Sequence, residues 1–295
     1  RTHFAQHSYI SHVDIYAGQG KAGLYDVGNE MEDVRFFGGD YGINTTKPSP
    51  GWPFMMVDTW FQGQRRAAIR THEAGLTIVR LHARDVPIVI DIDSNYHEKL
   101  FMEDCRFDDV KKAAIRISDE DNASNQINLR NIACRNTPVL TVGRISQKQI
   151  TSSSPIYVVK RLTSGLQLAG WNADPAFSTS SSIEQLSTFP EDAPSDIPAF
   201  PDMTTWTNIR MLGAKGDGTT DDTRAIQDAI DTHPTLYFPE GWYRITAPLH
   251  LKPNTVLIGL HPYATQIIIA DNTPAFGGFG GPQPMLETPR GGTNI

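Results

Sequence analysis

The sequence has 295 residues, 39% of them hydrophobic, and a formal net charge of −7 at pH 7; this charge argues against a nucleic-acid partner, because phosphates require a clustered basic surface. No run approaches the roughly 20 apolar residues of a membrane-spanning helix, and the first residues (RTHFAQHS) lack the pattern of a signal peptide. Two cysteines, Cys105 and Cys134, are too few for a disulfide framework or a thiolate metal site. We expect no metal and no cofactor. A neutral polysaccharide is a partner that fits the net negative charge of the chain.

An apolar-x-x-apolar-x-apolar pattern recurs through residues 1–145. Its copies are Ile10/Val13/Ile15, Met31/Val34/Phe36, Met56/Thr59/Phe61, Ile78/Leu81/Ala83, Met102/Cys105/Phe107 and Leu129/Ile132/Cys134. A second short apolar segment follows each copy, centred on Leu24, Ile43, Ile69, Ile90, Ile115 and Leu140. One copy cannot bury its own apolar residues, whereas stacked copies bury them in continuous ladders.

The repeat therefore predicts an all-β fold, a right-handed parallel β-helix whose successive turns, or rungs, stack on one another. Both cysteines fall on apolar positions of the pattern, so we expect them in the core. A bundle of amphipathic helices is the competing fold, but the segments are short, rich in β-branched residues and interrupted by Gly and Asn. We assign residues 1–145 to the later rungs of a first β-helix.

Residues 146–206 break this repeat. Residues 156–168 (IYVVKRLTSGLQL) could add strands, but from Trp171 onward the chain is rich in Ser, Thr, Pro and acidic residues. Such a composition buries little apolar surface and is typical of an extended connection. We predict an interdomain linker here.

A glycine-rich segment, GAKGDGTT at residues 213–220, opens the last part of the chain, residues 207–295. It lacks the lysine spacing of a phosphate-binding P-loop and the carboxylate spacing of an EF-hand. We expect Thr220 or Asp221 to cap a helix over residues 222–231. The apolar face of that helix would cover the end of a second β-helix, whose first strands follow it.

At these residues the chain resembles a known family. The segments GAKGDGTTDDT, LYFPEGWYRIT and LKPNTVLIGLHP are similar to the opening of the pectate-lyase-like β-helix superfamily, and in particular to glycoside hydrolase family 55. The first half resembles that family through HVDIYAGQGKAGLYDVGNEMEDVRFFGGDYG. The resemblance implies two tandem β-helices, a secreted or periplasmic protein, and inverting hydrolysis of β-1,3-glucan.

The resemblance also implies where catalysis occurs. In that family the active site lies between the two β-helices, and the general acid comes from later rungs of the second one, which would follow Ile295. We therefore expect this chain to be an internal part of a longer protein, with the remainder of that protein as its partner. No catalytic residue is assigned, and the chain alone is expected to be inactive.

Residues 58–75 gather aromatic and planar polar side chains beside an insertion at residues 45–52 (TTKPSPGW). Aromatic rings stack on the apolar faces of sugars, and planar polar groups bind sugar hydroxyls. The candidate substrate-binding residues in this stretch are Trp60, Gln64, Arg65, His72 and Glu73. A solvated rung edge with internal Arg–Glu pairs is the alternative.

The resemblance adds Gln19 and Tyr25, with Lys21 between them, because first-helix residues of the family reach the cleft near this point. The local sequence GKAGLYD departs from the fungal members, which place His-Gln there, and this departure weakens the assignment.

Two other functions remain open. A polysaccharide lyase of the same fold would act on an acidic sugar through a Lys or Arg base and calcium, but the residues expected to face outward alternate acid with base rather than stacking carboxylates. Those residues are Asp14, Arg35, Asp58, Arg80, Asp104 and Asn131. A non-catalytic adhesin or tailspike-like rod is the third hypothesis.

Overall fold

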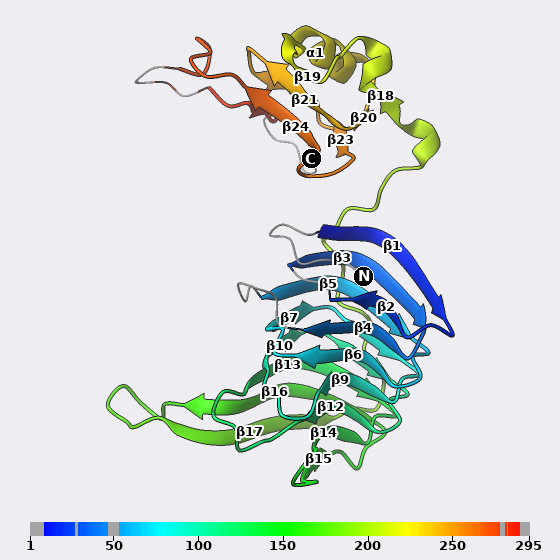
Figure 1. Cartoon of the computed structure of the whole chain (residues 1–295), viewed down its shortest axis with the longest axis vertical. Coiled ribbons are helices and arrows are strands. Elements are labelled where there is room, and N and C mark those ends of the chain that lie inside the picture. Colours follow the sequence, from blue (N-terminus) through cyan, green and yellow to red (C-terminus); the bar gives the residue numbers. More distant parts are fainter. Residues whose placement is uncertain (1–8, 27–28, 47–52, 278–280, 282, 290–295) are drawn as a thin grey trace. The chain divides into compact units, whose positions relative to one another are not determined.

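The computed structural model describes residues 9–26, 29–46, 53–277, 281 and 283–289. The chain divides into two compact units, Arg1–Ile197 and Pro198–Ile295 (Figure 1). The expected insertion at residues 45–52 falls largely outside the described residues. Within the described ranges, no helix is long and apolar enough to span a membrane.

The first unit is a β-solenoid with two walls of stacked strands. Sheet A contains β1 (Tyr9–Gly18), β3 (Glu30–Gly38), β5 (Phe54–Gln62), β7 (Leu76–Val79), β8 (His82–Arg84), β10 (Lys99–Glu103), β11 (Arg106–Asp108) and β13 (Gln126–Arg135). Sheet B contains β2 (Ala22–Tyr25), β4 (Tyr41–Thr46), β6 (Ala67–His72), β9 (Ile88–Ile92), β12 (Ala113–Ile117), β14 (Val139–Gly143) and β15 (Gln149–Thr151). In Figure 1 these strands succeed one another from blue β1 to green β15.

The predicted apolar positions form ladders through the solenoid. In sheet A, Met31 lies opposite Met56, Met56 opposite Ile78, Ile78 opposite Met102, and Met102 opposite Leu129, all in parallel register. These five side chains are buried, and Cys105 and Cys134 are buried in the same core. Burial raises the pKa of each thiol to about 12. The predicted repeat is therefore confirmed as the source of a continuous core.

Sheet B follows the prediction except at its last member. The aligned positions are Leu24, Ile43, Ile69, Ile90 and Ile115. Thr141, not the predicted Leu140, lies opposite Ile115. β14 is irregular here, with a register shift between Val139 and Thr141 against β15, and Leu140 is nevertheless buried.

A left-handed residue in each rung explains the apolar-x-x-apolar spacing. The third position of the pattern has φ between +46° and +55° and is occupied by His12, Asp33, Asp58, Arg80, Asp104 and Asn131. Such a residue bends the strand, and Asp and Asn tolerate this conformation better than most side chains. Asp14 and Arg35 face outward as predicted, but Arg35 lies opposite Trp60 rather than Asp58, so His12 and Asp33 are the residues that begin the column of bends.

Residues 146–206 are not simply an extended connection. β16 (Ile156–Gln167) pairs antiparallel with β13, and β17 (Ala176–Gln185) pairs antiparallel with β16. Tyr157, Val159 and Leu162 are buried in the solenoid core, and a register shift between Val159 and Arg161 against β17 interrupts the alternation of side chains along β16. The polar composition from Trp171 onward suits the exposed outer strand β17, which the sequence reasoning missed.

A buried carboxylate joins two neighbouring rungs of the first unit. Glu98 is fully buried and accepts hydrogen bonds from the backbone N–H groups of Ala74 (3.2 Å), Gly75 (2.8 Å) and Lys99 (2.9 Å) and from the Thr71 hydroxyl (2.5 Å). Burial raises the pKa of Glu98, and the hydrogen bonds that it accepts oppose that rise. The side chain thus supplies the acceptors for backbone N–H groups just before β7 and at the start of β10.

The second unit contains small sheets whose strand pairings are parallel. Its elements are β18 (Thr207–Asn208), β19 (Asp217–Asp221), β20 (Thr235–Phe238), β21 (Gly241–Ile245), β22 (Leu249–His250), β23 (Val256–Gly259), β24 (Thr265–Ile269), β25 (Leu286–Glu287), helix α1 (Thr223–Thr232) and two 3-10 helices, Met203–Thr205 and Ile209–Leu212. α1 buries Ile226, Ala229 and Ile230 in a core of its own unit. That this unit opens a second, tandem β-helix stays a prediction.

The glycine-rich loop is fastened by a carboxylate of its own chain. Asp222 is buried and accepts hydrogen bonds from the backbone N–H groups of Lys215 (2.7 Å) and Gly216 (2.9 Å). α1 begins at Thr223, one residue later than predicted, and Asp221 accepts a hydrogen bond from the Thr223 N–H (3.0 Å). The N-cap position is therefore Asp222, not Thr220 or Asp221 as predicted, and the Asp222 carboxylate makes no side-chain cap hydrogen bond because it is occupied by the loop amides.

Candidate functional site

The predicted substrate-binding residues do not meet in one site. Arg65 donates to the Gln19 side-chain oxygen (3.1 Å) and backbone oxygen (3.0 Å), and its guanidinium lies 2.8 Å from the Asp40 carboxylate. Tyr25 lies nearby in sequence, with the Lys21 ammonium 5.7 Å from its ring centre. Arg65 and Gln19 therefore fasten turns of adjacent rungs, and their role as sugar contacts stays a prediction.

Gln64 is turned into the solenoid. It is 2% exposed, and its amide nitrogen donates to the backbone oxygens of Phe36 (3.1 Å), Gly38 (3.2 Å) and Gln62 (3.1 Å). These contacts hold the turn that follows β5. The amide nitrogen is thus committed to the backbone, and the amide oxygen is buried, so a contact with substrate would require this turn to change.

His72 and Glu73 point to different partners. His72 Nε2 lies 2.7 Å from the Asp93 carboxylate, and its ring stacks on Tyr96 at 4.5 Å and 2°. The Glu73 carboxylate lies 3.1 Å from His97 Nδ1. No chemistry is implied by either pair alone, because each charged group already has a partner.

Trp60 is the predicted residue that lies in a cleft. Its indole stacks on the His82 ring, with centroids 4.6 Å apart and an angle of 17°. The cleft has a volume of about 150 Å³ and is lined by Trp60, His82, Ala83, Arg84, Arg106, Asp108, Arg135, Phe189 and Asp192. Successive rungs supply its floor through β5, β8, β11 and β13, since stacked strands bring equivalent positions together.

A segment that follows β17, residues 189–196, forms the other wall of this cleft, and we call it the strap. The Phe189 ring centre lies 4.2 Å from the Arg106 guanidinium and 4.6 Å from that of Arg135. Asp192 is ion-paired with Arg106 and lies 3.8 Å from His82 Nδ1. Cation–π contacts and ion pairs together therefore hold the strap against sheet A.

The strap is also fastened at its far end. The Asp196 carboxylate lies 2.5 Å from the Arg80 guanidinium, and the Ser195 hydroxyl donates to Asp58 at 2.5 Å. Sequence reasoning missed these contacts because they join residues 116 and 137 positions apart. The only signal was the acidic, aromatic composition of a stretch interpreted as linker.

The charges in the cleft are suited to binding hydroxyl groups. Burial and the neighbouring Arg106 lower the pKa of His82, and Asp192 opposes this effect, so we treat the imidazole as neutral at neutral pH. The Arg135 guanidinium donates to Asp108 (2.7 Å) and lowers the pKa of that carboxyl. An ionised Asp108 can accept a hydrogen bond from a sugar hydroxyl, whereas a general acid of a glycosidase needs a raised pKa.

The second unit has an open groove with two exposed aromatic rings. Trp242 is 56% exposed and Tyr263 is 44% exposed. The groove has a volume of about 380 Å³ and is lined by Gly216, Asp217, Glu240, Gly241, Trp242, Tyr263 and Ala264. Sequence reasoning missed these residues, although the alternation in GWYRI could have found Trp242: Tyr243 points into the core and Trp242 points out.

Metal-binding geometry is not present among the residues that the structure describes, where no group of three His, Cys, Asp or Glu side chains could hold an ion. The acidic residues of the glycine-rich loop have other partners. Asp217 accepts from the backbone N–H groups of Thr219 (2.8 Å) and Thr220 (2.7 Å), and these bonds lower its pKa.

Comparison with known proteins places the likeness in the second unit. Residues 206–291 match the family model described as "Rhamnogalacturonase A/epimerase, pectate lyase-like". This match agrees with the pectate-lyase-like part of the resemblance, and the narrower β-1,3-glucanase family stays a prediction.

Three curated relatives share short segments with the chain. The pre-neck appendage protein of Bacillus phage phi29 is 42% identical over 52 residues, covering 18% of this chain and 6% of that protein. Alginate lyase 7 of Azotobacter vinelandii is 41% identical over 76 residues, covering 22% and 9%. Glucan 1,3-beta-glucosidase of Cochliobolus carbonum is 38% identical over 56 residues, covering 18% and 7%. The chain thus spans less than a tenth of the length of each relative.

Proposed function

We propose that this protein is a carbohydrate-active β-solenoid that binds a neutral glycan and, at full length, hydrolyses β-1,3-glucan with inversion. The observation that carries the proposal is the groove of Trp242 and Tyr263, because it lies inside residues 206–291, the segment that matches the pectate-lyase-like model. Exposed aromatic rings beside carboxylates suit the apolar faces and hydroxyl groups of sugars. A glucan 1,3-beta-glucosidase among the relatives favours this linkage.

Catalysis itself is assigned to no residue here. An inverting glycosidase needs an acid and a base with carboxyl groups about 6.5–9.5 Å apart. The carboxylates of the Trp60 cleft, Asp108 and Asp192, are both paired with arginines. We propose that they bind sugar hydroxyls and that other residues of the full-length protein supply the acid and base. Such a protein would be secreted or periplasmic, where polysaccharides are found.

A second candidate is processing of an acidic polysaccharide. Arg84, Arg106 and Arg135 all line the Trp60 cleft, and guanidinium groups recognise carboxylates. Alginate lyase 7 is among the relatives. The strap already places Asp192 against Arg106, so an acidic substrate would have to compete with that carboxylate.

The test separates these activities by their products. The full-length protein is incubated with laminarin and with polygalacturonate or alginate, and reducing ends and the ultraviolet absorbance of unsaturated sugars are measured. Reducing ends from laminarin, without absorbance from the uronates, are expected. Absorbance from a uronate would support the second candidate, and binding of laminarin without any product would favour a non-catalytic rod.

A further inference from the structure

A cavity of the first unit lies where the regular rungs end. The cavity has a volume of about 420 Å³, within the roughly 300–1,000 Å³ range of small-ligand sites. Its lining comes from both walls of the solenoid: Thr141 and Ile150 belong to β14 and β15, and Leu162 and Ser164 belong to β16. The cavity therefore occupies the space between the sheets that another rung would fill.

The strand directions explain why this space is open. β15 runs antiparallel to β14 in sheet B, and β16 runs antiparallel to β13 in sheet A. Both walls thus end in reversed strands, and the chain does not continue as a rung between them. Ile117, Ile150 and Leu162 supply the apolar part of the lining, and Ile117 and Leu162 are themselves buried.

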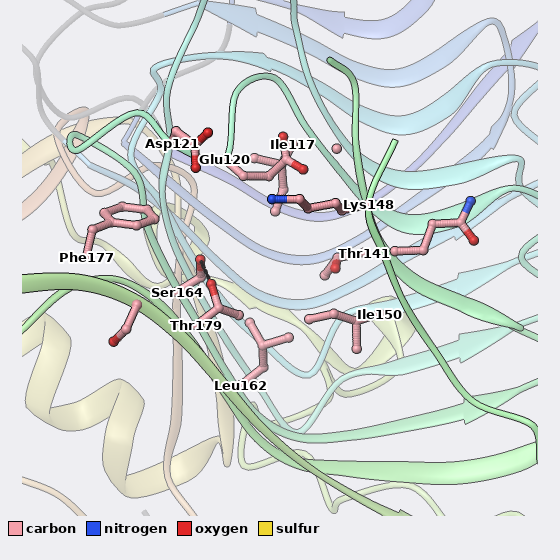
Figure 2. A pocket seen from close by; sticks show the side chains of 13 residues that line it. Ile117, Glu120, Asp121, Thr141, Lys148, Ile150, Leu162, Ser164, Phe177 and Thr179 are labelled. Atoms are coloured by element: carbon pink, nitrogen blue, oxygen red, sulfur yellow. Dashed lines mark hydrogen bonds between the residues drawn. The ribbon is translucent and has the colours of Figure 1, made fainter. Parts of the chain in front are cut away.

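Polar groups surround that apolar part of the lining. Figure 2 shows Glu120 and Lys148 across the cavity from Ser164 and Thr179, with the Phe177 ring at one side. The Ser164 and Thr179 hydroxyls are hydrogen-bonded to each other at 2.8 Å. An aromatic face, hydroxyl pairs and carboxylates around an apolar lining are the groups that bind a sugar ring and its hydroxyls.

Glu120 is held in place for this role. The Ser146 hydroxyl donates to its Oε1. A Cβ atom at Gly143 would lie 1.7 Å from that same oxygen, so the glycine provides the room in which the carboxylate lies. Gly143 does not need its conformational freedom here, because its φ is not in the left-handed region. The glycine therefore serves the position of the carboxylate rather than a turn.

The charges indicate a neutral ligand. The cavity is lined by two carboxylates, Glu120 and Asp121, and one ammonium, Lys148. In the described part of the chain none of the three forms an ion pair, so the second oxygen of Glu120, the Asp121 carboxylate and the Lys148 ammonium can accept from or donate to sugar hydroxyls. The net negative charge would repel a uronate.

We infer that this cavity is a further glycan site, which holds a mono- or disaccharide end of a neutral glycan apart from the Trp60 cleft and the Trp242 groove. The choice of a sugar over another polyol rests on the proposed function. The site requires no reaction: it would tether the polymer by one end while another segment of it is bound elsewhere, and tethering of this kind raises the effective concentration of the bound polymer.

The experiment measures binding of laminaribiose to the full chain by calorimetry, and locates it by hydrogen exchange. Protection of amides in residues 117–121, 141–150 and 162–179 is expected. Glu120→Gln and Gly143→Ala should each weaken binding at this location about tenfold or more, the loss expected for one hydrogen bond to a charged group. Glucuronic acid should not protect these amides.

Matched controls separate binding from folding. Glu184→Gln removes an exposed carboxylate of β17 that pairs with Lys160 and does not line the cavity. Gly170→Ala adds a methyl group in open space. Both should bind laminaribiose as the unchanged chain does. Glu120→Gln keeps the shape of the side chain, so it tests the site even where Gly143→Ala disturbs β14.

Three results would overturn the inference: no protection of these segments by laminaribiose, protection that survives both Glu120→Gln and Gly143→Ala, or stronger binding of glucuronic acid. Its failure differs from a failure of the proposed function. Loss of laminarin hydrolysis with intact cavity binding removes only the proposed reaction, and hydrolysis with no cavity binding removes only this site.

Discussion

Each unit has a buried carboxylate that accepts hydrogen bonds from backbone N–H groups, but the two carboxylates lie at very different sequence separations from those groups. In the first unit Glu98 accepts hydrogen bonds from the N–H groups of Ala74 and Gly75 in the preceding rung, 24 and 23 residues away. In the second unit Asp222 accepts hydrogen bonds from the N–H groups of Lys215 and Gly216, seven and six residues away. A buried N–H group needs an acceptor in either case.

The difference decides what each contact stabilises. Glu98 joins one rung to the next, so its loss should weaken the stacking on which a solenoid depends, because each rung contacts only its neighbours. Asp222 fastens one loop to the start of α1, so its loss should remain local. Loss of Glu98 should therefore destabilise the protein more than loss of Asp222.

The largest effect is expected from Glu98→Gln. An amide in this position turns NH₂ toward backbone donors and leaves at least one buried N–H without an acceptor, at a cost of about 2–4 kcal/mol in the free energy of unfolding of the first unit. Urea denaturation followed by hydrogen exchange in that unit measures it. Glu73→Gln, a half-buried neighbour paired with His97, is the control and should cost less than about 1 kcal/mol.

Asp222→Asn should cost less, about 1–3 kcal/mol, because two backbone donors rather than three depend on the side chain. We expect the amides of Lys215 and Gly216 to exchange faster while the rest of the second unit keeps its protection. An equal loss of protection throughout that unit would contradict the local role that the comparison assigns to Asp222.

A smaller loss of stability is expected when a residue at the bend of a rung is replaced. Asp104 has φ of +55°, where a β-branched residue is strained. Asp104→Val should destabilise the first unit by about 1–2 kcal/mol. Asp104→Gly loses the same hydrogen bond from Asn131 but accepts the conformation, so it should cost less than Asp104→Val. Equal losses in the two variants would show that the bend does not depend on this residue.

The smallest effect concerns pH. His82 has a lowered pKa in the folded chain, so the unfolded chain binds more protons as the pH falls below the ordinary value of about 6.5. This residue therefore contributes stability above that pH that is lost on acidification. Comparing the slope of unfolding free energy between pH 7.5 and 5.5 for the unchanged chain and His82→Asn isolates it: the variant should have the shallower slope. A steeper slope in the variant would refute the direction of this shift.

Much of the first unit could be predicted from the sequence, because the repeat that defines a rung is local and recurs. The ladder from Met31 to Leu129 follows directly from the spacing of apolar residues. The bends at Asp58 and Asp104 were visible only as a spacing, since a single sequence does not state which residue has a positive φ. β17 was missed because its strand is exposed on the outside, and its Ser and Thr residues resemble a linker.

The candidate site could be predicted only in part. Trp60 as a sugar contact stays a prediction, and its neighbours in the cleft, His82, Asp192 and Phe189, come from another rung and from the strap. Contacts over such separations depend on the completed fold. Trp60, Gln64 and His72 are close in sequence but do not meet in space. The rung turns Gln64 toward the interior, and His72 contacts Asp93 instead.

The most direct test of the central claim, that exposed aromatic residues of this β-solenoid bind a neutral glycan, is affinity electrophoresis of the chain in native gels containing laminarin or polygalacturonate. We expect laminarin to retard the chain, polygalacturonate to leave its mobility unchanged, and Trp242→Ala to lose most of the retardation, since a stacked sugar ring on an exposed indole depends on that side chain. Val256→Ala, an exposed apolar residue outside the groove, should migrate as the unchanged chain does. Retardation by polygalacturonate alone, or laminarin retardation that Trp242→Ala leaves intact, would contradict the account.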